Sequence, residues 1–334
     1  MTGEFEIRGW RPGDEVRLLE AHNRQFAATD GTRSMAHWRW KYLDNPTGQV
    51  HIVLADHRQH GIVGCYITLP VPVQVDGRAT VAGQPVDLFV LAEFRRAGQR
   101  PGLFVNCALK HYELFGGTGP GQNAFHYGWA VPNWRIGRRY LQYQMIRDWD
   151  FLFREIAGGA PPRAVSGELE MRPLPRCGAD HDALWQALAP AFRIAIVRDA
   201  RYLNWRYADA HDRSYRMFEC RERRSGRLRG LCVYAQNDFL MPNTAYLVDW
   251  LCPPDDDECT DTMLGHVEQL AVQNGAAVIA TTFEKPDPRF LKFQRRGYLV
   301  YPTPYFTGVV SFDGNDTFFY RTLWYQTPGD SDLV

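Results

Sequence analysis

The sequence predicts an α/β protein with two similar domains in tandem, each built on a mixed sheet. Three segments recur in the same order about 165 residues apart. The matching pairs are WRWKYLDNP (38–46) with NWRYADAH (204–211), FEIR (5–8) with LEMR (169–172), and VDLF (86–89) with VDWL (248–251). Fixed order at nearly constant spacing indicates duplication of one structural unit. Two copies of this length predict two domains and not a solenoid of short repeats.

Length and composition agree with this organisation. A chain of 334 residues has the length of about two ordinary domains. We expect a first domain at 1–156, a Gly- and Pro-rich linker at 157–167, and a second domain at 168–334.

Charge, hydropathy and cysteine usage limit the class of protein. Lys plus Arg equals Asp plus Glu at 38 each, so no global field draws in nucleic acid or an anionic membrane. The apolar runs are only as long as strands, and the first residues lack the pattern of a signal peptide. The seven cysteines are scattered without a C-x-x-C pair, which indicates reduced thiols and no metal site. We therefore expect a cytoplasmic monomer or homodimer.

The first half alternates strand and helix patterns. Its expected strands are 50–55 and 62–69 as a hairpin, two strands around Asp76-Gly77, a buried central strand 86–92, and 123–131. Its expected helices over the later part are 102–115 and 133–144.

This order of elements resembles the GNAT (Gcn5-related N-acetyltransferase) superfamily. The clearest local motif is Asn133 followed seven residues later by Tyr140, which places both on one helix face. In the second half, PDPRFLKFQRRGYLV (286–300) resembles the same region, but Pro286 and Phe293 replace the two polar residues. The resemblance therefore implies two tandem GNAT-like domains, of which the second is degenerate.

A basic, Gly-containing loop follows the predicted central strand. In GNAT enzymes this loop and the next helix N-terminus bind the pyrophosphate of acetyl-CoA, because unpaired backbone N–H groups meet the anion there. The family pattern can be placed in two frames, and the resemblance implies cosubstrate contacts from Arg95, Arg96, Gly98, Arg100 and Gly102. The alternative is a solvated basic turn that caps a helix. In the second half, Asp255–Glu258 occupies this place, and its negative charge argues against phosphate binding.

Three side chains are candidates for chemistry or for orienting the cosubstrate. The resemblance implies that Tyr140 protonates the leaving thiolate and that Asn133 orients the pantetheine arm. Tyr140 could equally pack a helix face, and Asn133 could cap the following helix. Asp87, inside an apolar segment, is either a catalytic base or a structurally paired acid. Asp249 occupies the matching place in the second copy, which favours the structural role.

The resemblance implies an acyl-CoA-dependent N-acyltransferase, with acetyl-CoA as cosubstrate and no metal. The expected acceptor is a small amine or an amino sugar, since the ending FYRTLWYQTPGDSDLV resembles tails of tandem GNAT-like proteins associated with exopolysaccharide. Two alternatives stay open. One is a Fem-type aminoacyl transferase, which also pairs GNAT-like domains. The other is a non-catalytic GNAT-like binding protein.

Overall fold

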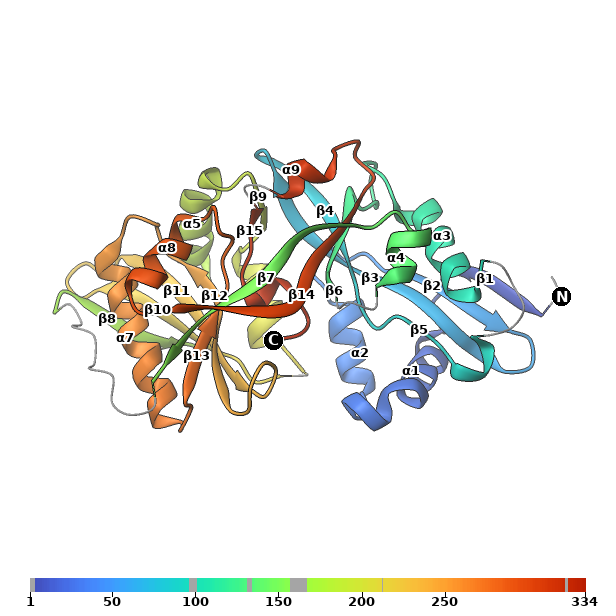
Figure 1. Cartoon of the computed structure of the whole chain (residues 1–334), viewed down its shortest axis with the longest axis horizontal. Helices are drawn as coiled ribbons and strands as arrows, with labels where there is room; N and C mark the ends of the chain where they lie inside the picture. The colour runs from blue at the N-terminus through green and yellow to red at the C-terminus, as the bar shows by residue number, and fades with distance from the viewer. Residues whose placement is uncertain (1–3, 96–100, 131–133, 157–166, 212, 322–323) are drawn as a thin grey trace. The chain divides into compact units, whose positions relative to one another are not determined.

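The computed structural model describes residues 4–95, 101–130, 134–156, 167–211, 213–321 and 324–334 (Figure 1). The chain forms two compact units, each assembled from separate segments. Unit 1 comprises Met1–Val73, Ala79–Arg147 and Phe306–Tyr320, and unit 2 comprises Gln74–Arg78, Asp148–Tyr305 and Arg321–Val334. Among the described residues, no helix is long and apolar enough to cross a membrane.

Unit 1 is a mixed α/β unit with strand order β1-β2-β3-β4-β6-β14. Its strands are β1 (Phe5–Gly9), β2 (His51–His57), most of β3 (Gly61–Val75) and of β4 (Arg78–Pro85), β5 (Phe89–Val90), β6 (Phe125–Ala130) and the end of β14 (Leu299–Ser311). Its helices are α1 (Glu15–Asp30), α2 (Met35–Tyr42), α3 (Leu103–Phe115), α4 (Arg135–Tyr140) and most of α9 (Thr317–Arg321). The strand β7 (Gln144–Glu155) begins here and continues in unit 2.

Local turn chemistry fixes the hairpins of this sheet. β2 and β3 pair antiparallel, with His57 opposite Gly61 at the turn. Between β3 and β4, Asp76 and Gly77 both have positive φ, 48° and 74°. Two consecutive residues of this kind make a turn whose twist matches that of the strands. Both predicted hairpins are confirmed.

The parallel pair β4–β6 lies at the centre of unit 1. The two strands pair at Ala82–Phe125 and at Gly83–His126, and α3 makes the crossover between them. A Cβ on Gly83 would lie 2.5 Å from His126 Cδ2, so only glycine allows this close approach.

Two predicted elements need correction. The segment 86–92 is not a continuous central strand, because only Phe89–Val90 is strand and Asp87 has a φ of 54°. Its apolar content reflects burial, not a regular extended backbone. The helix predicted at 133–144 is shorter, since α4 covers Arg135–Tyr140 and β7 begins at Gln144.

Unit 2 repeats the plan, with strand order β7-β13-β12-β11-β10-β8. Its strands are β8 (Leu169–Leu174), β9 (Ile194–Ile196), β10 (Arg216–Glu222), β11 (Leu228–Asn237), β12 (Thr244–Leu251), β13 (Val278–Thr281) and β15 (Trp324–Tyr325). Its helices are α5 (Ala179–Leu188), α6 (Ala200–Leu203), which continues as a π-helix at Asn204–Ala208, α7 (Asp257–Gln273) and α8 (Pro288–Arg295). Here α7 separates the parallel pair β12–β13, as α3 separates β4–β6.

The strand β14 belongs to both units in turn. It begins in unit 2, where Thr303 Oγ1 donates to the Trp149 carbonyl over 2.5 Å. It ends in unit 1, where Phe306–Ser311 pairs antiparallel with β6 over six residues. The sheet of unit 1 is therefore completed by a segment far from it in sequence.

Candidate functional site

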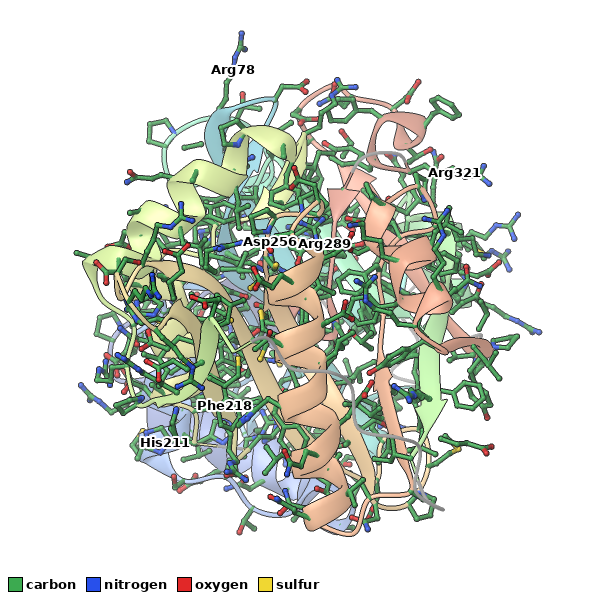
Figure 2. All side chains as sticks on the ribbon, turned by 90° about the vertical axis from the view of Figure 1, so that its left-hand side faces the viewer. Arg78, His211, Phe218, Asp256, Arg289 and Arg321 are labelled. Atoms are coloured by element: carbon green, nitrogen blue, oxygen red, sulfur yellow. The ribbon has the colours of Figure 1, made fainter. Side chains whose placement is uncertain are left out.

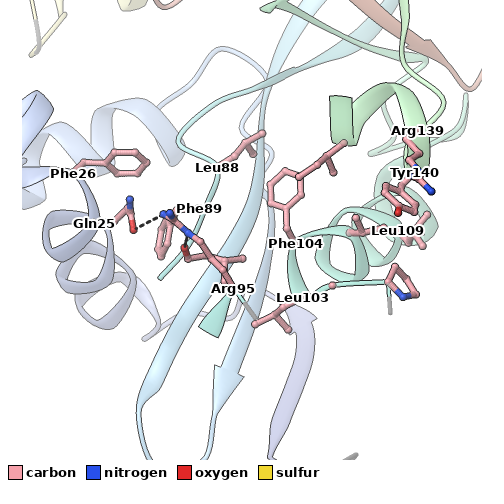
Figure 3. Close-up of a pocket in the computed structure, with 15 residues that line it drawn as sticks. Gln25, Phe26, Leu88, Phe89, Arg95, Leu103, Phe104, Leu109, Arg139 and Tyr140 are labelled. Carbon is pink, nitrogen blue, oxygen red and sulfur yellow. Dashed lines mark hydrogen bonds between the residues drawn. The ribbon is translucent and has the colours of Figure 1, made fainter. Parts of the chain in front are cut away.

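A cavity of about 1050 Å³ lies in unit 1, at the N-terminus of α3. Figure 3 shows it between α1, β5, α3 and α4. Its apolar lining consists of Phe26, Leu88, Phe89, Val90, Pro101, Leu103, Phe104, Val105, Leu109 and Ile136. Arg95, Gly102 and Tyr140, three of the residues singled out in the sequence, also line it. Gln25 and Arg139 complete the lining.

The N-terminus of α3 is open toward this cavity. Gly102 is the N-cap residue, and no described side chain caps the helix there. The φ of Gly102 is −65°, so glycine is not required by the backbone conformation. A Cβ at Gly102 would meet no atom within 4 Å, so the absent side chain leaves space in front of the helix. Backbone N–H groups and the positive end of a 13-residue helix can therefore meet an anion.

Arg95 is held at the edge of the cavity by its neighbours. Its Nε donates to the Val90 carbonyl over 2.9 Å, and its Nη2 lies 3.4 Å from Gln25 Oε1 (Figure 3). These bonds leave the guanidinium on the cavity wall with a fixed orientation. An oriented guanidinium is suited to a phosphate oxygen.

Arg139 is a second cation on the cavity wall, and the sequence reasoning missed it. Its guanidinium carbon lies 5.3 Å from the centre of the Tyr140 ring. The signal in the sequence was the run RIGRRY (135–140), which contains three arginines and follows the expected phosphate loop after one helix and one strand. Two arginines and a helix N-terminus therefore surround one cavity.

Tyr140 is exposed on the wall of the cavity and is not a core residue. Its side chain is 47% exposed, whereas Phe293, its sequence counterpart, is 1% exposed. Phe293 packs on Trp250, Phe283 and Tyr298, so the two rings occupy different environments. The alternative in which Tyr140 packs one helix face does not fit the structure, and its role as proton donor stays a prediction.

Asp87 lies outside the cavity lining, in a buried group of cations. Its carboxylate accepts from Lys41 Nζ over 2.9 Å and pairs with Arg33 Nη1 over 2.6 Å. Tyr42 donates to the same oxygen, and His22 Nε2 lies 3.7 Å from the other. Burial acts to raise the pKa of Asp87, but Lys41, His22 and Arg33 hold it well below its ordinary value. A carboxylate that stays ionised is a weak proton acceptor, so this geometry favours the structural interpretation.

The duplicated half contains the same group. Asp249 accepts from Arg198 Nε over 2.9 Å and from Tyr207 over 2.8 Å. Arg198 and Tyr207 follow Arg33 and Tyr42 at the spacing of the repeat. The repeated WRWKY and NWRY segments thus supply a buried tyrosine to a buried carboxylate in both units, as expected for scaffold.

A second buried polar group in unit 1 is built from three histidines, which share Asn123 and Thr68. His51 Nδ1 lies 3.1 Å from Asn123 Oδ1, and His126 Nε2 lies 3.1 Å from Asn123 Nδ2. His111 Nε2 lies 3.1 Å from Thr68 Oγ1. Burial lowers the pKa of His51 to about 4 and that of His111 to about 3. The pKa of His126 is also well below its ordinary value, because of burial and the two neighbouring rings. We conclude that His126 is a core residue of this neutral cluster.

The remaining predicted residues, Arg96, Gly98, Arg100 and Asn133, lie outside the described residues. Their contacts with a cosubstrate therefore stay predictions.

In unit 2 the helix equivalent to α3 is capped by carboxylates. Asp256 is the N-cap of α7, where it accepts from the Cys259 backbone N–H over 3.0 Å. Asp257 pairs with Lys292 over 2.8 Å and with Arg296 over 2.9 Å. An anion at this helix would have to displace the protein's own carboxylates, which agrees with the charge argument from the sequence.

Comparison with known proteins finds similar folds at low sequence identity. No protein-family profile matches the chain, and no curated protein matches it in sequence. Solved structures do match. A probable N-acyltransferase from Enterococcus faecalis is 10% identical in sequence and has a TM-score of 0.65. The match covers 92% of this chain and 73% of the other protein's chain. A GCN5-related N-acetyltransferase from Anabaena variabilis is 11% identical with a TM-score of 0.65, covering 91% and 72%.

A third match is N-myristoyltransferase of Saccharomyces cerevisiae with bound myristoyl-CoA. It is 11% identical with a TM-score of 0.58, covering 94% of this chain and 80% of its own. The chain thus has the mixed α/β fold of the GCN5-related N-acetyltransferases, as its motifs indicated.

Proposed function

We propose that the protein is an acyl-CoA-dependent N-acyltransferase with its site in unit 1. The observation that carries this proposal is the joining of four features on one cavity: the open N-terminus of α3, Arg95, Arg139 and the exposed phenol of Tyr140. The first three suit a pyrophosphate, and the apolar wall beside them suits a pantetheine arm. The fold shared with acyltransferases supports the same assignment.

The reaction makes one bond, breaks one, and carries one proton overall from the amine to the thiolate. The acceptor amine attacks the thioester carbonyl, the new C–N bond forms, and the C–S bond breaks. In our proposal Tyr140 gives its phenolic proton to the departing CoA thiolate, the proton lost by the amine passes to water, and water returns a proton to the Tyr140 phenolate. A general acid of this kind contributes about 10²–10⁴ in rate.

The donor we propose is acetyl-CoA, and the acceptor a small amine or an amino sugar. The resemblance of the chain's ending to tails of exopolysaccharide-associated proteins supports the amino sugar. We place the site in unit 1 alone, because α7 in unit 2 begins with its own carboxylates.

Thermal shift with CoA and acetyl-CoA tests the cosubstrate. A ligand at a hundred times its dissociation constant stabilises the native state by about 2.7 kcal/mol, which a melting curve detects. Arg95→Ala and Arg139→Ala should each reduce the shift. Arg138→Ala is the matched control, since Arg138 is exposed on the same helix but does not line the cavity. If millimolar CoA gives no shift, the acyl-CoA proposal fails, and aminoacyl transfer or a binding role takes its place.

A further inference from the structure

Four sulfur side chains converge beneath α7 in unit 2. Cys220 comes from β10, Cys252 follows the end of β12, and Cys259 and Met263 lie one helical turn apart on α7. All four are fully buried. Figure 2 shows sulfur atoms gathered behind this helix, below the label of Asp256. Three separate segments supply the thiols, so no C-x-x-C motif marks this group in the sequence.

Part of this group has the spacing of a metal centre. The ligand atoms of Cys252, Cys259 and Asp256 all lie within 4.8 Å of one another. Cys259 Sγ is 3.5 Å from Met263 Sδ, and Cys220 on β10 lies opposite Gly230 on β11. A tetrahedral thiolate site with metal–sulfur bonds of about 2.3 Å places its sulfurs about 3.8 Å apart. The separation between Cys259 Sγ and Met263 Sδ is close to that spacing.

The backbone leaves room for the cluster at one position. Gly230 on β11 lies under the helix, and a Cβ there would lie 2.9 Å from Cys259 Sγ and 2.7 Å from Met263 Sδ. The φ of Gly230 is not in the left-handed region, so the glycine is not explained by a turn. The sulfur atoms of Cys259 and Met263 occupy the space that a side chain at position 230 would fill.

Asp256 lies within reach of the two thiols and is held in place by its neighbours. One carboxylate oxygen already accepts from Arg229 Nε and Nη2 over 2.9 and 2.7 Å, and the other accepts from the Cys259 backbone N–H. Asp256 therefore fixes the start of α7 and the backbone that carries Cys259. Asp255 and Glu258 are exposed on the same turn and would attract a cation toward it.

We propose that Cys252, Cys259 and Asp256 bind a thiophilic d¹⁰ metal ion, of the class of Zn²⁺ and Cd²⁺, with Cys220 and Met263 beside it. Thiolate and thioether sulfurs select these soft ions over Mg²⁺ or Ca²⁺. Each thiol that becomes a ligand releases its proton to solvent. The site is separate from the acyl-CoA cavity, which lies in unit 1, and does not depend on the proposed function.

Cadmium is the probe for this proposal. The reduced, chelator-treated full chain should bind one Cd²⁺ with a thiolate-to-metal charge-transfer absorption and a measurable release of protons. Cys259→Ser, Cys252→Ser and Asp256→Asn should each weaken Cd²⁺ binding by more than the roughly 10–100-fold that losing an outer partner costs. Cys107→Ser is the matched control, because Cys107 is an equally buried helical thiol in unit 1. It should leave Cd²⁺ binding unchanged.

A second variant keeps the test decisive if a serine at 259 prevents folding, as circular dichroism would show. Gly230→Ala keeps all the sulfurs but fills the space among them, and should also abolish binding. The proposal is overturned if the wild-type chain gives no charge-transfer band. It is equally overturned if the cysteine variants that fold bind Cd²⁺ as tightly as the Cys107→Ser control.

Discussion

The hydroxyl of Tyr207 donates to the carboxylate of Asp249 over 2.8 Å, deep inside unit 2. Tyr42 and Asp87 make the same pair in unit 1. A bond that recurs in both copies, although only one copy has the open cavity, is a property of the scaffold. Asp87 is therefore expected to matter for stability before it matters for turnover.

Asp87→Asn should lower the free energy of unfolding by about 3–5 kcal/mol, the usual cost of removing one member of a buried ion pair. Lys41 and Arg33 would lose the carboxylate that neutralises them. Asp249→Asn should cost less, because Arg198 keeps a second carboxylate, Asp330, at 2.7 Å. Urea unfolding of the two variants measures the difference. A stable Asp87→Asn variant without turnover would restore the catalytic interpretation.

The cosubstrate should bind once per chain. Titration calorimetry with CoA is expected to give a stoichiometry near one. The helix α3 presents an uncapped N-terminus to a cavity, whereas its counterpart α7 is capped by Asp256. Asp256→Asn and Asp257→Asn should leave that stoichiometry unchanged. Two CoA molecules per wild-type chain would contradict the charge argument for unit 2.

Tyr140→Phe should lower the rate of acyl transfer by about 10²–10⁴ while CoA affinity and melting temperature stay close to wild type. The variant removes the phenolic O–H and keeps a ring that is already exposed. If no acceptor is known, release of free CoA by thioester hydrolysis can report the rate. Arg138→Ala, on the same helix, provides the control for general effects on α4. Unchanged turnover in Tyr140→Phe would remove Tyr140 from the mechanism.

The buried histidine cluster should make the protein sensitive to mild acid. The pKa values of His51 and His111 fall to about 4 and about 3 in the folded state, and that of His126 is also well below its ordinary value. In the unfolded chain these three histidines have pKa values of about 6.5, so near pH 5 they bind about three more protons there than in the folded state. The stability that the cluster contributes above pH 6.5 should be lost by about 4 kcal/mol per pH unit as pH falls from about 5.5 to 4.5, and protonation of Asp330, whose pKa burial raises to about 6, offsets part of that loss.

Urea midpoints across this range test the effect, and His111→Gln should reduce the slope by about 1.4 kcal/mol per pH unit. Replacing His211, which is exposed and lies outside the cluster, provides the control variant. A slope in the His111→Gln variant equal to that of the wild type would show that His111 is not one of the groups that bind these protons.

Local chemistry explains which parts of the structure could be predicted from the sequence. Asp76-Gly77 defines its own turn, and the repeat of Trp, a basic residue and Tyr indicated a common scaffold. The segment 86–92 was wrongly predicted to be a continuous strand. Its apolar content indicates burial, but it does not indicate the positive φ of Asp87. Arg139 and the sulfur cluster were missed because their neighbours are distant in sequence. The pair Arg33 and Arg198 was also missed, although the spacing of the repeat aligns these two arginines in the sequence.

The division of β14 between the units has a consequence for biosynthesis. On the ribosome, β6 is made some 180 residues before its antiparallel partner Phe306–Ser311. Until that partner is translated, β6 lacks the neighbour that covers one of its sides and presents unpaired backbone groups there. The first half of the chain therefore cannot finish folding as it emerges, although domains commonly do so in order of synthesis. Maturation of the proposed acyl-CoA site is thus tied to synthesis of the chain as far as Ser311, and a nascent chain stalled before residue 306 would carry an open sheet edge for chaperones to protect.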